Sequence, residues 1–109
     1  MSQNEQRAIA ANLLLERLEL KRDIAQIKAD LSKRAESVVK LGTLLRSNPQ
    51  VIDIDDQTLP PDYVQRAQKF SSEDLDPKRL GVLVDELRTK TDKLTTAEQQ
   101  IRAMGYPLD

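Results

Sequence analysis

The fold is decided by residues 3–47, which read QNEQRAIAANLLLERLELKRDIAQIKADLSKRAESVVKLGTLLRS. This stretch contains no proline, and its first glycine is Gly42. Ser2 and Glu5 have the spacing of a capping box, which satisfies free N–H groups of a first helical turn, so the sequence predicts a helix that begins at about residue 3. Such a helix is about 66 Å long, roughly four times the length of an average globular helix.

Apolar residues repeat along this stretch with heptad spacing. One column contains Leu13, Leu20, Ile27, Arg34 and Leu41, and its partner column contains Ala10, Arg17, Ile24, Leu31, Val38 and Leu45. Together the two columns form a seam along one face of the helix. A neighbouring column, Ala11, Leu18, Ala25, Ser32 and Val39, widens the apolar stripe. Because such seams pack on other helices, the sequence predicts an all-α, coiled-coil-like fold.

Two arginines, Arg17 and Arg34, occupy positions in this seam. Polar residues in a seam can fix the register or the oligomeric state of a helical assembly. We favour a second interpretation, in which the aliphatic stems carry the charged groups to the edge of the seam. Asp30 and Arg34 also have the i,i+4 spacing of a favourable ion pair.

The long helix is predicted to end at about residue 47. Asn48-Pro49 follows it, and the residue before a proline avoids the α region. Residues 48–61 lack helical periodicity and form an acidic loop, in which residues 51–56 are a short β-like run.

A return arm occupies residues 62–109. It contains a short helix at about 62–70 and a helix at about 77–104, which begins after the N-cap and first-turn proline pair Asp76-Pro77. Because the arm matches the first helix in length, we predict a long helical hairpin within one elongated domain, 1–109. The alternative is a set of separate helices that dock on other chains.

The strongest interaction signal is the run Leu13-Leu14-Leu15. Successive helix residues point about 100° apart, so three leucines span more arc than one antiparallel helix covers. We therefore expect a contact with a second chain, and the alternative is burial of these leucines under the C-terminal tail. The residues predicted to bind partners are Leu13, Leu14, Leu15, Leu18, Leu20, Ile24, Ile27, Leu31, Val51, Ile52 and Ile54.

Residues 51–56, VIDIDD, resemble a SUMO-interacting motif, in which aliphatic side chains in a V-I-x-I pattern precede acidic residues. Such a motif adds a strand to the edge of a sheet in its partner, with the carboxylates facing basic residues. A SUMO-like partner at Val51–Asp56 is one interpretation of this segment. We favour the other, in which Val51, Ile52 and Ile54 cover the open end of the hairpin.

The charge balance shifts along the chain. Residues 1–47 hold nine basic and six acidic residues, whereas residues 48–76 hold two basic and seven acidic residues. No segment is basic enough to be a nucleic-acid-binding arm, so we expect no nucleic-acid partner. No apolar run approaches the roughly 18 residues of a membrane span, and the N-terminus lacks the apolar core of a signal peptide. We expect no membrane contact and a soluble intracellular protein, cytoplasmic or nuclear.

Catalytic and metal-binding side chains are scarce. The chain contains no histidine and no cysteine, so the usual general base and the thiol nucleophile are absent. An EF-hand loop that started at Asp53 would need glycine and glutamate where the chain has Thr58 and Val64. We therefore expect neither an enzyme nor a metal site, and no cofactor.

These observations favour a non-catalytic helical subunit or adaptor that packs its heptad seam against helices of partner chains in a larger complex. Two alternatives remain open. The first is a homo-oligomer, such as a dimeric four-helix bundle, with a structural or regulatory role. The second is a small helical chaperone or secretion-type cargo binder, in which the apolar stripe receives a client.

Overall fold

A computed structural model describes residues 2–108 of the chain. Its elements are α1 (Gln3–Ser47), the 3-10 turn η1 (Pro49–Val51), β1 (Ile52–Ile54), α2 (Pro61–Val64), β2 (Gln68–Phe70) and α3 (Pro77–Ala103). They belong to two compact units. The first unit contains α1 up to Lys28 and the chain from Leu83 onward, and the second unit is Ala29–Val82.

The long helix predicted at about 3–47 is confirmed as α1. The backbone N–H of Glu5 donates to Ser2 Oγ at 3.1 Å, which is one half of the predicted capping box. Gly42 lies inside the helix, where glycine costs about 1 kcal/mol relative to alanine. The helix continues past this glycine and ends at Ser47, shortly before Pro49.

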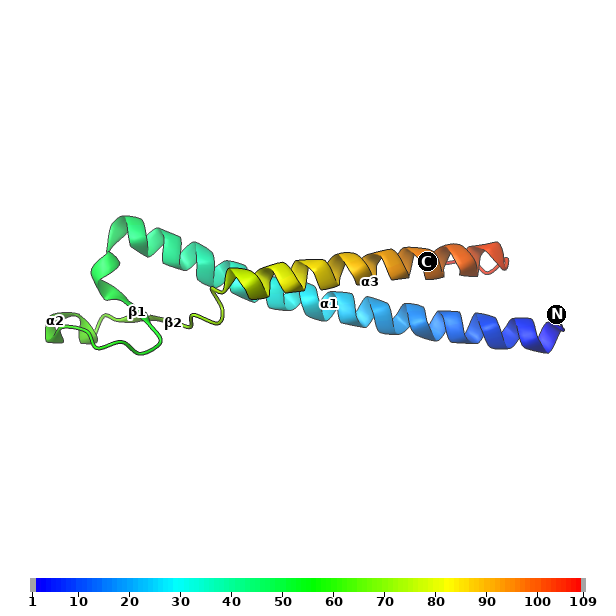
Figure 1. Cartoon of the computed structure of the whole chain (residues 1–109), viewed down its shortest axis with the longest axis horizontal. Coiled ribbons are helices and arrows are strands. Elements are labelled where there is room, and N and C mark those ends of the chain that lie inside the picture. Colours follow the sequence, from blue (N-terminus) through cyan, green and yellow to red (C-terminus); the bar gives the residue numbers. More distant parts are fainter. Residues whose placement is uncertain (1, 109) are drawn as a thin grey trace. The chain divides into compact units, whose positions relative to one another are not determined.

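In the first unit, α1 and α3 pack as an antiparallel hairpin, and Figure 1 shows α3 running back along the N-terminal part of α1. The residues buried in this unit are Ala10, Leu20, Ile24 and Ile27 on α1 and Leu83, Ala97 and Ile101 on α3. The four residues on α1 belong to the predicted seam. Their burial supplies the hydrophobic free energy that an isolated helix lacks. The hairpin is therefore confirmed, and the alternative of helices that only dock separately on other chains is wrong.

Two ion pairs join the helices of the first unit. Arg17 Nε donates to Glu98 Oε2 at 3.0 Å, and Lys90 Nζ lies 3.0 Å from Asp23 Oδ2. The Arg17 side chain is only 14% exposed. The Arg17 guanidinium group thus binds a carboxylate of α3, and its charge is compensated within the hairpin.

Both ends of α3 are capped, and the sequence predicts the cap at Asp76. At the N-terminal end, Asp76 Oδ1 accepts a hydrogen bond from the N–H of Lys78 at 3.0 Å. At the C-terminal end, Gly105 has a φ of 88°, and the N–H of Tyr106 donates to the carbonyl oxygen of Ile101 at 3.3 Å. A glycine in this left-handed conformation lets the chain turn back and satisfy the last helical carbonyl groups.

Replacement of Asp76 by alanine is expected to lower the free energy of unfolding by about 1 kcal/mol, because it removes the N-cap acceptor of α3. Glu86→Ala is the matched control, since Glu86 is an exposed carboxylate farther along the same helix. Chemical denaturation of both variants measures the difference. Equal stabilities of the two variants would show that the Asp76 carboxylate does not cap α3.

The second unit contains a parallel pair of short strands, β1 and β2. The sequence predicts a β-like run at the first strand but not the second strand. β1 pairs with β2, with Ile54 opposite Phe70. The predicted short helix at about 62–70 is wrong beyond Val64, because α2 has only four residues and residues 68–70 form β2. Phe70 is buried. Burial of its ring and pairing with β1 therefore outweigh the helix propensity of the residues that precede it.

Arg34 is buried in the second unit and connects α1 to the loop at residues 71–76, between β2 and α3. Its Nε donates to Asp30 Oδ1 at 2.9 Å, which confirms the predicted i,i+4 pair, and its Nη1 donates to the carbonyl oxygen of Glu73 at 2.6 Å. The Arg34 side chain is 8% exposed. The interpretation in which its stem reaches the solvent edge is therefore wrong for this residue.

An acidic turn follows β1. Asp53 is buried, and its Oδ1 accepts a hydrogen bond from the N–H of Gln57 at 2.6 Å. Asp55 and Asp56 have φ values of 57° and 55°, in the left-handed region that aspartate tolerates better than most residues. Hydrogen bonds from Ser72, by its side chain and then by its backbone N–H, lower the pKa of Asp55. Two of these aspartates, Asp53 and Asp55, thus stabilise the turn by accepting backbone hydrogen bonds.

Candidate functional site

Three exposed leucines lie close together on α1 in the first unit. Leu14 is 41% exposed, and Leu15 and Leu18 are each 55% exposed. Single exposed leucines are ordinary on protein surfaces, whereas a contiguous apolar group is typical of an interaction site. The leucine run that the sequence singles out is therefore only partly covered within this chain.

The spacing along α1 places these leucines outside the two seam columns. Residues seven apart lie close to one column of an α-helix, because two turns take about 7.2 residues, and the column of Leu15 lies opposite the two seam columns. The column of Leu18 lies beside it, and the column of Leu14 borders both the Leu18 column and the seam. We call this surface the outer face, and its apolar residues in the first unit are Ala8, Ala11, Leu14, Leu15, Leu18 and Ala25.

The other residues predicted to bind partners lie elsewhere. Leu20, Ile24 and Ile27 are buried in the first unit, and Leu13 and Leu31 are half-buried. Their apolar surface is largely covered within the chain. Among the predicted residues on α1, those with exposed side chains are Leu14, Leu15 and Leu18.

Four basic residues share the outer face with the leucines. Arg7, Lys21 and Lys28 lie in the same column as Leu14, and Arg22 lies in the column of Leu15. All four side chains are exposed, and none forms an ion pair with any residue between 2 and 108. Their seven-residue spacing is visible in the sequence, but none of the four is among the residues predicted to bind partners. The outer face is thus both apolar and basic.

Two acidic residues, Glu5 and Glu19, lie in the column at the other border of the outer face. Both are exposed. The apolar residues therefore have a basic border on one side and an acidic border on the other. Such an arrangement gives a bound helix a preferred orientation.

The exposed surface of α3 has a different character. Its exposed residues in the first unit include the polar side chains of Thr89, Thr95, Gln99 and Arg102. Thr95 Oγ1 donates to the carbonyl oxygen of Thr91 at 3.0 Å, so this hydroxyl group is satisfied within its own helix. This surface offers no leucine group comparable to the outer face of α1, and it provides positions for control substitutions.

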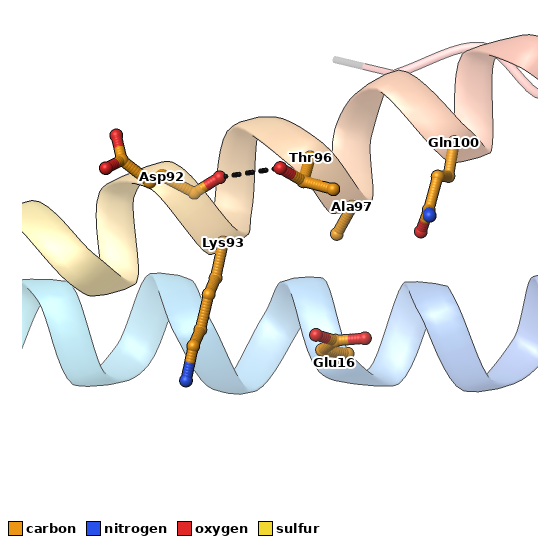
Figure 2. A pocket seen from close by; sticks show the side chains of 6 residues that line it. All are labelled: Glu16, Asp92, Lys93, Thr96, Ala97 and Gln100. Carbon is orange, nitrogen blue, oxygen red and sulfur yellow. Dashed lines mark hydrogen bonds between the residues drawn. The ribbon is translucent and has the colours of Figure 1, made fainter.

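A shallow polar groove lies between α1 and α3 in the first unit (Figure 2). Glu16 contributes from α1, and the other five residues that line it come from α3: Asp92, Lys93, Thr96, Ala97 and Gln100. Thr96 Oγ1 donates to the carbonyl oxygen of Asp92 at 3.0 Å, so its hydroxyl group is already engaged. The groove is open to solvent.

The segment that resembles a SUMO-interacting motif lies in the second unit. The β-like run is confirmed in part, since Ile52–Ile54 form β1 and pair with β2. Val51 is 3% exposed, and Ile52 and Ile54 are half-buried. The aliphatic side chains that such a motif must present are thus largely covered, so this geometry offers no support for strand addition at this segment.

No family model matches the chain, and no curated protein or solved structure is significantly similar to it. Across residues 2–108, no helix combines the length and the apolar character that crossing a membrane requires. The functional conclusion therefore depends on the residues of this chain alone, and the outer face of α1 is the surface that they distinguish.

Proposed function

We propose that the chain is a non-catalytic helical interaction subunit and that it binds a helix of a partner chain through the outer face of α1. The observation that carries this proposal is the exposure of Leu14, Leu15 and Leu18 on the part of α1 whose seam residues Ala10, Leu20, Ile24 and Ile27 are already buried. In this proposal the seam stabilises the hairpin, and the outer face remains for the partner.

The leucines supply part of the binding free energy. About half of each side chain remains exposed, so covering all three yields about 2–4 kcal/mol. Loss of translational and rotational freedom on association costs at least about 4 kcal/mol. A stable complex therefore needs further contacts along α1, and the partner must extend beyond the leucine group.

A helix is the partner element that fits this surface best. The exposed leucines and alanines follow columns with seven-residue spacing. A second helix packs on such columns by placing its side chains in the spaces between those of the first helix. The small side chains of Ala11 and Ala25 allow close approach on either side of Leu18. A homo-oligomer or an exchangeable client would use the same surface, and the test below separates them from a stable partner.

The proposal predicts that Leu15→Glu combined with Leu18→Glu lowers the affinity for the partner at least about tenfold, because two carboxylates enter an apolar contact. Both positions are more than half exposed, so the hairpin itself should keep its helix content. The measurement is quantitative co-purification of the tagged full chain from its source cells, with circular dichroism of each variant.

The matched control is Thr89→Glu with Gln99→Glu, which adds the same two charges to the exposed surface of α3. It should co-purify its partner as the unchanged chain does. A single partner in fixed ratio supports an interaction subunit, whereas a self-associated chain alone indicates a homo-oligomer, and many partners in small amounts indicate a client binder. Equal loss of binding in both double variants would contradict the role of the outer face.

A further inference from the structure

We infer that the partner of the outer face is an acidic amphipathic helix from a different protein, whose carboxylates face Arg7, Lys21, Arg22 and Lys28. This inference rests on the proposed function and names the chemistry of the partner. It follows from the arrangement of charge around the exposed leucines.

The basic residues border the apolar contact directly. Lys21 and Lys28 lie one and two heptads after Leu14 in the same column, and Arg7 lies one heptad before it. Positions that border a helix–helix contact are those whose charges select the partner and its orientation. Because these basic side chains are exposed and form no ion pair within residues 2–108, their charges remain available to a partner.

A second copy of this chain fits the outer face less well than an acidic helix does. In a parallel pair, the basic border of each helix would face Glu5 and Glu19 of its copy, which favours association, but residues at the centre of the contact meet their own copies, so Arg22 would face Arg22. In an antiparallel pair, the same border of each helix comes together, so Lys21 and Lys28 would face a second set of lysines. Like charges that face each other oppose association, so the charge pattern favours a different chain with carboxylates on its matching border.

An anionic membrane surface also fits poorly. Helices that lie on membranes usually combine a wide apolar face that holds aromatic rings with a polar face rich in lysine and arginine. The outer face holds three large apolar side chains, and α1 contains no aromatic residue. Glu5 and Glu19 border the same face and would be repelled by anionic lipid. The acidic helix satisfies the basic border without this conflict.

The test compares two charge reversals in the full chain. Lys21→Glu with Lys28→Glu changes the basic border of the outer face, and Lys93→Glu with Arg102→Glu makes the same change in net charge on exposed residues of α3. At about 0.1 M salt the first pair is expected to lower the affinity for the co-purified partner about tenfold or more, and the second pair should change it less than about threefold. Raising the salt to about 1 M should weaken binding of the unchanged chain and reduce the difference between the variants.

Carbodiimide cross-linking of the purified complex identifies the carboxylates that contact the outer face, because the reagent joins a lysine amine to a carboxylate in direct contact. Links from Lys21 or Lys28 to aspartate or glutamate in a helical segment of another protein support the inference. Links to carboxylates of a second copy of this chain overturn it in favour of a homodimer. Binding to vesicles of phosphatidylcholine and phosphatidylserine, lost in the Lys21→Glu, Lys28→Glu variant and without a protein partner, overturns it in favour of a membrane surface.

Failure of the inference is distinguishable from failure of the proposed function. If Leu15→Glu with Leu18→Glu abolishes partner binding but the reversal at Lys21 and Lys28 has no effect, the outer face binds a helix that is not acidic. In that case the inference is wrong and the proposed function stands. If neither pair of substitutions affects binding, or if no partner is bound, both are wrong.

Discussion

Replacement of Ile101 by alanine is expected to destabilise the hairpin by about 2–4 kcal/mol, the largest effect that we predict for a single substitution. Ile101 is fully buried, with 0% of its surface exposed. Truncation removes the transfer free energy of its methyl and methylene groups and leaves a cavity that the two helices can close only in part. Because small domains are stable by about 5–15 kcal/mol, this change is a large fraction of the total.

Leu18→Ala is the matched control for Ile101→Ala. It removes a similar amount of apolar side chain from a position that is 55% exposed, and alanine is a better helix former than leucine. We expect its cost to stay below about 1 kcal/mol. Thermal and chemical denaturation of the two variants measure the contrast, and a Leu18→Ala cost equal to that of Ile101→Ala would show that the seam is not the core of the hairpin.

Arg34→Met is expected to destabilise the second unit by about 2–3 kcal/mol. The methionine keeps much of the aliphatic stem but removes both hydrogen bonds, at 2.9 Å to Asp30 and at 2.6 Å to the Glu73 carbonyl oxygen. Hydrogen bonds from charged donors contribute about 1.5–3 kcal/mol each, and a partly buried acceptor left without its donor adds a desolvation cost. Arg34→Lys should have an intermediate effect, because one ammonium group cannot reproduce both donor geometries.

Hydrogen exchange localises the effect of Arg34→Met. Amides of residues 71–76 should exchange faster, because Glu73 loses its tie to α1, whereas amides of the Ile101 region should keep their protection. Lys33→Met on the exposed surface of the same helix is the control and should leave residues 71–76 unchanged. Unchanged exchange at residues 71–76 in the Arg34→Met variant would show that the guanidinium group does not hold this loop.

The helices were predictable because their signals are local. Ser2 caps α1, Asp76 caps α3 and Gly105 ends α3, and each acts within a few residues of its own position. The heptad spacing of the α1 seam then selects the face that is buried, and Leu20, Ile24 and Ile27 lie there. Local caps and periodicity together account for most of the first unit.

The second unit was harder to predict because its structure depends on distant partners. Residues 68–70 form a strand only beside Ile52–Ile54, and no local pattern in Gln-Lys-Phe indicates that pairing. In the same way, Arg34 binds a carbonyl oxygen 39 residues away in the sequence. A charged residue in an apolar seam is unusual, so the sequence already distinguishes Arg34. Only the tertiary structure identifies the carbonyl group that it binds.

The candidate site was predicted in part. The run Leu13-Leu14-Leu15 indicated more apolar surface than one helix covers, and Leu14 and Leu15 are indeed exposed whereas Leu13 is half-buried. The accompanying charges were not predicted, because neither the apolar columns nor the net charge of residues 1–47 indicates on which face of α1 a basic residue lies. The column of Arg7, Leu14, Lys21 and Lys28 becomes visible only when polar residues are placed on the same helical columns as the leucines.

The most direct test of the central claim is photo-cross-linking from the outer face in the source cells. A benzophenone-bearing amino acid replaces Leu15 in one version of the full chain and Gln99, on the exposed surface of α3, in another. We predict that position 15 forms an adduct with a helical segment of another chain, identified by mass spectrometry, and that position 99 does not. The absence of an adduct at position 15, or the same adduct from both positions, would contradict the proposal that the outer face of α1 binds a partner helix.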